Sequence, residues 1–161
     1  MQGSGETPGS EICAGNDFAL IRIDPRDAPN VHPAALEFGG PTELLRGNAA
    51  VGDQVFTYGQ SSFHLGSPAL EAKQGQITAQ SPGGWTYSVR TDNPGLPGDS
   101  GSAVLHESGG ALGVLATVGL SIGLGGSVSN GVVHLQMALD YANATRFDGQ
   151  MELVTWEEFT P

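Results

Sequence analysis

Hydrophobic and polar residues alternate along much of this chain, in short runs separated by glycine and proline. The clearest run is at residues 85–91, where Trp85, Tyr87 and Val89 are hydrophobic or aromatic and the residues between them are polar. A period of two predicts a half-buried strand. Other apolar runs predict further strands, at residues 17–23, 51–58, 72–79, 102–105 and 111–118. Short strands at this spacing, with turn residues between them, predict an all-β barrel or sandwich.

The remaining segments have other patterns. Residues 132–144 carry apolar side chains at partly helical spacing, and no proline or glycine interrupts residues 132–148, so we expect a helix there. Four prolines in residues 24–50 predict a connector that crosses the surface. We expect residues 1–12 to be a disordered lead, and residues 149–161 to pack on the surface as a strap.

Composition limits the partners that the protein can have. The chain has 161 residues with 6 Lys+Arg against 17 Asp+Glu, a formal net charge of -11. This charge argues against nucleic acid and against anionic membrane surfaces as partners. No apolar run reaches the length of a membrane-spanning helix, and the polar N-terminus does not have the pattern of a signal peptide. The 25 glycines suit a fold with many tight turns.

The candidate chemistry lies at residues 98–102, which read Gly-Asp-Ser-Gly-Ser. This pentapeptide follows a turn rich in proline and glycine and precedes an apolar run. A serine on such a bend presents its hydroxyl while nearby backbone N–H groups point into a shared hollow, where they can bind an oxyanion. The pattern therefore predicts that Ser100 is the nucleophile of a hydrolase.

The pentapeptide matches the nucleophile loop of the trypsin/chymotrypsin-like serine proteases. Residues 16–21, Asn-Asp-Phe-Ala-Leu-Ile, resemble the segment that carries the aspartate of this family, and the two motifs come in the family's order. Residues 96–103, 111–117 and 129–132 are similar to extracellular proteases of actinobacterial type. The resemblance covers residues 12–147. It implies a trypsin-like β-barrel with a C-terminal helix, secretion, and hydrolysis of polypeptide substrates through an acyl-enzyme.

The resemblance also implies roles for individual residues. Ser100 would be the nucleophile and Asp17 the carboxylate that orients the base, while the N–H groups of Gly98 and Ser100 would form the oxyanion hole. Asp99 would shape that hole through internal hydrogen bonds or an ion pair and would not be catalytic.

A specificity pocket follows from the same comparison. Trypsin has a selective aspartate six residues before its nucleophile, and Pro94 stands there in this chain. The far wall would be Thr117, Val118 and Gly119, with Thr117 also a candidate to support Asp17. These residues do not predict tryptic cleavage.

One part of the family's pattern is missing. The family's base lies in an Ala-His-Cys segment well before the aspartate, but only 16 residues precede Asp17 and none is histidine. The four histidines, none of them followed by cysteine, come after Asp17, and we expect each to be structural or exposed; they are His32, His64, His106 and His134.

We therefore expect an N-terminally truncated chain. Residues 1–38 would be a remnant of the first barrel with the inter-barrel connector, residues 39–147 the second barrel with its helix, and residues 148–161 a tail. Cysteine count alone favours a free thiol at Cys13. The resemblance instead implies a disulfide from this residue within the first barrel.

Three functions stay open from the sequence. The first is a serine endopeptidase fragment without its base, whose partners are a polypeptide substrate and a missing N-terminal barrel segment. The second is an inactive protease-like module that binds peptides or proteins. The third is an acidic β domain with a chance motif. No Cys/His or paired-carboxylate spacing demands a metal, so we expect no cofactor.

Overall fold

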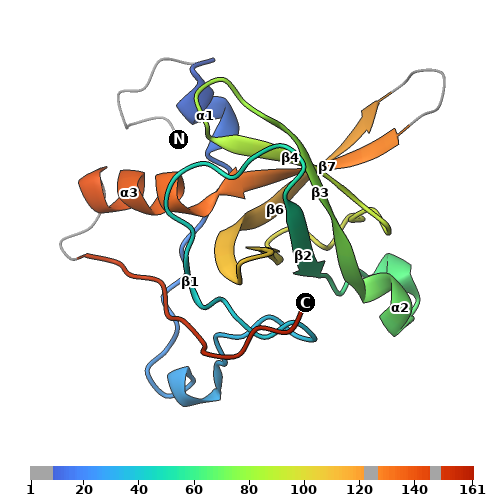
Figure 1. Ribbon diagram of the computed structural model, residues 1–161. Coiled ribbons are helices and arrows are strands. Elements are labelled where there is room, and N and C mark those ends of the chain that lie inside the picture. Colours follow the sequence, from blue (N-terminus) through green and yellow to red (C-terminus); the bar gives the residue numbers. More distant parts are fainter. Residues whose placement is uncertain (1–8, 122–126, 146–149) are drawn as a thin grey trace.

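The computed structural model describes residues 9–121, 127–145 and 150–161, and most of them belong to one β-barrel (Figure 1). Six antiparallel strands follow one another in the order β6-β5-β2-β3-β4-β7, and β7 pairs back onto β6 to close the barrel. The expected all-β barrel is therefore confirmed. The six strands are β2 (Gln54–Tyr58), β3 (Ala72–Gln80), β4 (Thr86–Thr91), β5 (Ala103–His106), β6 (Gly110–Ser121) and β7 (Ser127–His134).

Short elements surround the barrel. Strand β1 (Glu43–Leu44) pairs in parallel with β6. The longest helix in the described residues is α3 (Leu135–Thr145). No helix in this part of the chain is long and apolar enough to cross a membrane. The other helical segments are α1 (Glu11–Gly15), η1 (Ala28–Asn30), η2 (Ser62–His64) and α2 (Pro68–Glu71).

The barrel interior is filled by the inward positions of the strands. In β4, Tyr87 and Val89 are buried and the residues between them are less so, which confirms the period-two prediction. The same layer contains Val55, Ile77, Val104, Leu112, Leu115 and Val132.

Two glycines allow strands to approach closely. A Cβ at Gly75 of β3 would lie 2.0 Å from the carbonyl oxygen of Arg90, and one at Gly113 of β6 would lie 2.0 Å from that of Val133. No side chain fits at either position without moving a backbone.

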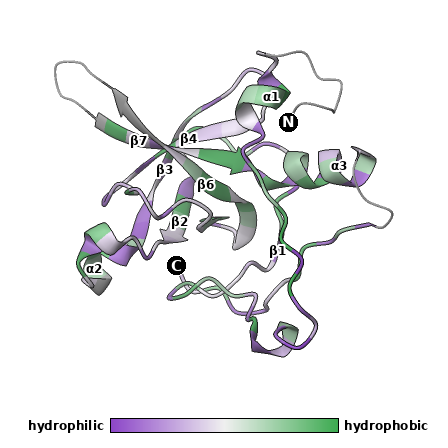
Figure 2. Ribbon diagram, turned by 180° about the vertical axis from the view of Figure 1, so that it is seen from behind, coloured by the Kyte–Doolittle hydropathy of each residue, from purple (hydrophilic) through white to green (hydrophobic). Residues whose placement is uncertain are grey.

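The expected strand at residues 17–23 is wrong, because this stretch has no regular structure. Its N–H groups donate no backbone hydrogen bond to the described part of the chain, so no ladder forms. Figure 2 shows the segment running from α1 past β1 with hydrophobic residues along it. The most exposed of these is Ile21, at 86%.

The expected limits of two other segments also change. Val132 and Val133 belong to β7, so α3 begins at Leu135 and not at residue 132. Both valines are buried and pair with β4 and β6, and this packing outweighs their place in a helical pattern. The expected disordered lead of residues 1–12 overlaps α1, which begins at Glu11; residues 1–8 lie outside the described residues.

The C-terminal segment lies against residues 38–41 (Figure 1). The N–H of Trp156 donates to Pro41 O at 2.7 Å, and that of Thr160 donates to Phe38 O at 2.9 Å. Phe159 also packs its ring against Phe56 of β2. This segment is the strap that its hydrophobic residues predict, whereas the three-part division of the chain stays a prediction.

Candidate active site

Ser100 lies on an exposed bend just before β5. Two glycines flank it, Gly98 with φ of +103° and Gly101 with φ of +92°. Only glycine adopts such angles without strain. The Ser100 side chain is exposed, and its Oγ lies 3.4 Å from the carbonyl oxygen of Ala116.

The bend leaves two backbone donors free. The N–H of Asp99 donates to Leu96 O at 2.9 Å, and that of Gly101 donates to Leu115 O at 2.7 Å. The N–H groups of Gly98 and Ser100 have no acceptor anywhere in the described part of the chain. Two unpaired donors on one rigid bend are what an oxyanion requires.

Asp99 holds this bend from inside. Its side chain is fully buried, with Oδ1 accepting from Ser61 N and Oδ2 from Leu96 N, each at 2.9 Å. Lys73 Nζ lies 3.4 Å from Oδ2, and His64 Nε2 lies 3.2 Å from it. The His64 ring is not oriented for a hydrogen bond, so its contact is electrostatic.

These partners keep Asp99 ionised. Burial by itself raises the pKa of Asp99, but the Leu96 and Ser61 hydrogen bonds outweigh it, helped by the charges of Lys73 and His64. The net effect lowers the pKa. A buried carboxylate with two N–H donors and a lysine is a fixed anchor for the loop.

Sequence reasoning missed Lys73 as part of this anchor. Lys73 is as buried as Ile77, which shares its face of β3, and its ammonium also donates to Glu71 O at 3.1 Å. The available signal was a lysine at an inward position of a predicted strand, because charged residues are rarely buried unless they are paired.

Asp17 and Ser100 line the same hollow, of about 410 Å³, and residues 114–116 of β6 form its floor. The structure therefore brings the predicted carboxylate and nucleophile to one place. Asp17 is exposed but its neighbours hold it: Asn16 is buried, and Phe18 packs against the cluster formed by α3 and β6.

A second hollow, of about 440 Å³, lies on the other side of Ser100. Gly98 and Tyr58 line it, together with residues 34–36 of the connector. Ser100 thus stands between two open depressions. An equally large hollow between β1, α3 and the C-terminal segment contains none of the predicted site residues.

The predicted specificity pocket has a support that the sequence did not reveal. The buried Asn130 of β7 accepts from Gly95 N at 2.8 Å and donates to the carbonyl oxygen of Thr117 at 3.3 Å. It therefore ties the wall beside Pro94 to the wall at Thr117. Val118 and Gly119 continue β6 and pair with β7.

No histidine of the described chain contacts Ser100. His64 faces Asp99, His134 Nδ1 lies 3.1 Å from Gly84 O, and His106 contacts Asp53 and Ser108. His32 is exposed, and its ring packs edge-on against Trp156. None of the four histidines is therefore placed to accept the proton of Ser100.

Two comparisons with known proteins bear on this site. The sequence model of the trypsin-like peptidase domain family matches residues 5–114, a stretch that includes both Asp17 and Ser100. No curated protein matches the chain significantly.

Proposed function

Because the chain belongs to the trypsin-like peptidase domain family, we propose that it carries the nucleophilic half of a secreted, actinobacterial-type serine endopeptidase. Ser100 is the nucleophile, Asp17 the orienting carboxylate, and the Gly98 and Ser100 N–H groups the oxyanion hole. The observation that carries the proposal is the pair of unpaired N–H donors beside an exposed serine hydroxyl.

The base comes from polypeptide outside these 161 residues. Its imidazole would enter the hollow between Asp17 and Ser100, which no histidine of the described residues occupies. The exposed apolar residues of the 17–23 segment suit contact with the barrel that brings this imidazole, and Ile21 lines the same hollow.

Peptide hydrolysis would then proceed by acyl transfer to Ser100. Ser100 Oγ attacks the peptide carbonyl carbon while the imidazole takes its proton, and the two N–H groups stabilise the oxyanion that forms. The imidazolium returns the proton to the leaving amine, which leaves an ester on Ser100. Water, deprotonated by the same imidazole, cleaves that ester.

A chemical test uses free imidazole in place of the missing side chain. Loss of a triad histidine costs about 2 × 10⁶ in kcat, so a fluorophosphonate probe should label the chain negligibly by itself. The labelling rate should rise with imidazole concentration and reach a plateau, because imidazole binds between Asp17 and Ser100. Joining the chain to a first barrel that carries an Ala-His-Cys segment should accelerate it further.

Two serine variants make the test specific. Ser100→Ala should abolish imidazole-dependent labelling, whereas Ser102→Ala, two residues away on the same loop, should keep it. Rapid labelling without imidazole would place the base inside the chain. Failure to label in every condition would remove the endopeptidase assignment.

The second candidate is an inactive peptide- or protein-binding module. The observation in its favour is that no described histidine contacts Ser100. Such a module would bind unstructured peptides in the hollows beside Ser100, without turnover even after it is joined to a first barrel.

A further inference from the structure

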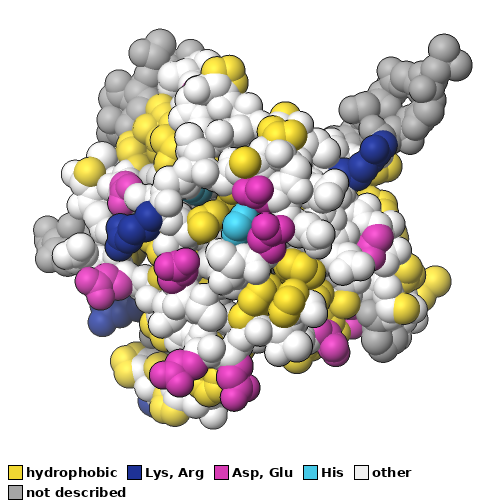
Figure 3. All heavy atoms as spheres, viewed as in Figure 1, with side chains coloured by type: hydrophobic (Ala, Val, Ile, Leu, Met, Phe, Trp, Pro, Cys, Tyr) yellow, Lys and Arg dark blue, Asp and Glu magenta, His cyan; other side chains and the backbone are white. Residues whose placement is uncertain are grey.

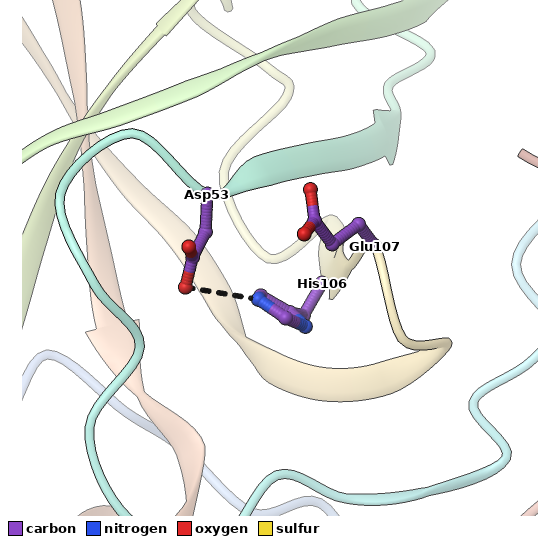
Figure 4. Close-up of side chains that lie close together, drawn as sticks. All are labelled: Asp53, His106 and Glu107. Carbon is purple, nitrogen blue, oxygen red and sulfur yellow. Dashed lines mark hydrogen bonds and ion pairs between the residues drawn. The ribbon is translucent and has the colours of Figure 1, made fainter.

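A group of three potential metal ligands lies away from Ser100, at the other end of β5. Asp53 precedes β2, His106 is the last residue of β5 and Glu107 follows it in the turn, and the pairing of β2 with β5 brings them together. One ligand atom from each lies within 4.8 Å of the other two. Figure 4 shows the three side chains converging, with Asp53 Oδ2 3.1 Å from His106 Nε2.

Each of the three ligand residues has a further hydrogen bond that orients its side chain. Ala50 N–H donates to Asp53 Oδ2 at 2.7 Å, and Gln54 N–H donates to Glu107 Oε2 at 3.0 Å. On the ring, Nδ1 lies 2.9 Å from Ser108 Oγ. Ser108 N–H also donates to Nδ1 at 3.1 Å. Partners of this kind orient metal ligands in metalloproteins. Because His106 Nε2 is bonded to Asp53 Oδ2, a metal ion would take the place of that hydrogen bond.

The charge of the group also suits a cation. Within the described residues neither carboxylate forms an ion pair with lysine or arginine. Two carboxylates beside one imidazole give a concentrated negative charge.

The ligand atoms can be reached from solvent. The side chains of His106 and Asp53 are 13% and 29% exposed, and Glu107 is more exposed than either. Figure 3 shows a histidine side chain that reaches the surface between acidic side chains. A metal ion could therefore enter without any movement of the backbone.

We propose that Asp53, His106 and Glu107 bind a divalent transition metal, with Zn²⁺ as the best match. One nitrogen and two carboxylate oxygens suit Zn²⁺, whereas Ca²⁺ and Mg²⁺ prefer oxygen ligands alone. Ligand atoms about 2.1 Å from a tetrahedral ion are about 3.4 Å apart, close to the Asp53–His106 separation. Rotation of the exposed Glu107 side chain brings in the third ligand.

The ion would link the loop before β2 to the turn between β5 and β6. His106 is about 10 Å along β5 from Ala103, where the nucleophile loop ends. The metal therefore stabilises the barrel and takes no part in acyl transfer. The sequence concealed the site, because 53 positions separate Asp53 from His106 and the spacing matches no metal-binding motif.

Zinc binding to the 161-residue chain tests the proposal. Calorimetry after treatment with a chelator should show one equivalent of Zn²⁺ bound, and zinc at a hundredfold excess over Kd should raise Tm by about 5–10 °C. His106→Gln and Asp53→Asn should each weaken binding by at least about 100-fold. The matched control is His32→Gln, which removes another exposed histidine and should leave binding unchanged.

Glu107→Gln should fold normally, because this exposed side chain lies in the turn after β5. It should weaken zinc binding while the circular dichroism spectrum stays native. The proposal is overturned if the native chain binds no zinc. It is also overturned if all three site variants retain full affinity, if His32→Gln loses it, or if millimolar Ca²⁺ displaces the zinc.

Discussion

At the scale of single residues, the nucleophile loop depends on one buried carboxylate. Asp99 connects three separate segments, because it binds the backbone at Ser61 and Leu96 and pairs with Lys73 of β3. The exposed hydroxyl next to it owes its position to these buried bonds.

We predict that Asp99→Asn destabilises the protein by about 3–5 kcal/mol, because the change leaves the buried Lys73 without its counter-charge. Asp27→Asn, at an exposed carboxylate with no side-chain hydrogen bond or ion pair in the described chain, should change stability little. Urea unfolding of both variants gives the comparison. A loss below 1 kcal/mol for Asp99→Asn would show that the ion pair does not stabilise the fold.

A second prediction concerns the oxyanion hole. Gly98→Ala should lower imidazole-dependent acylation of Ser100 by about 10²–10³, because a side chain at φ of +103° turns the N–H out of place. Gly52→Ala is the matched control, since Gly52 has φ of +102° and lies in the turn before β2, with no atom within 4 Å of an added Cβ. Equal rates in the two variants would remove Gly98 from the proposed site.

At the scale of secondary-structure elements, the junction of β7 with α3 contains a buried histidine. His134 is 2% exposed, and burial lowers its pKa despite the hydrogen bond to Gly84 O. The folded protein therefore keeps this ring neutral at a pH where the unfolded chain protonates it.

The sign of the resulting pH dependence follows from linkage. The stability contributed by neutral His134 is fully present above the unfolded pKa of about 6.5 and is lost as the pH falls below it, by up to about 1.4 kcal/mol per pH unit. His134→Asn, which keeps a donor near Gly84 but cannot titrate, should flatten this slope between pH 7 and 5. Urea unfolding across this range measures the slope, and an unchanged slope in the variant would contradict the prediction. His32→Asn should leave the slope unchanged.

The sequence predicted the barrel strands well because their signal is local. Inward residues such as Tyr87 and Val89 alternate with polar ones, and turns rich in glycine separate the runs. It failed at residues 17–23, where the apolar pattern is present but a strand also needs a neighbour to pair with. It also placed Val132 in the helix, because periodicity alone cannot separate a buried strand end from the first turn of a helix.

At the scale of the whole molecule, the apolar residues of the 17–23 segment lie outside the barrel. Leu20, Ile21 and Ile23 are 44%, 86% and 46% exposed, and the N–H groups of residues 17–23 make no backbone hydrogen bond in the part of the chain that the structure describes. Exposed apolar surface is typical of sites that contact other polypeptides, which agrees with the proposed contact between this segment and a first barrel.

We expect the amides of residues 17–23 to exchange hydrogen rapidly, and those of β4 to exchange slowly as an internal control. Joining the chain to a first barrel should protect the 17–23 segment and leave β4 unchanged. Mass spectrometry of the exchanged peptides measures both. Slow exchange at residues 17–23 in the chain by itself would show that they already have hydrogen-bond partners.

Parts of the candidate site could be predicted and parts could not. Ser100, Gly98 and Asp99 form one contiguous motif, and Asp17 lies in another, so sequence could indicate all four. The supporting residues lie far apart along the chain: Lys73 reaches Asp99 from β3, and Asn130 reaches Thr117 and Gly95 from β7. Only the closure of the barrel brings them together.

The strap at the C-terminus has a practical consequence. It holds residues 38–41 through main-chain hydrogen bonds, and the neighbouring residues 34–36 form a wall of the hollow that Gly98 shares. An affinity handle fused behind Pro161 would begin two residues after Thr160, directly beside the last hydrogen bond of the strap. Assays of peptide affinity should therefore compare material before and after removal of such a handle.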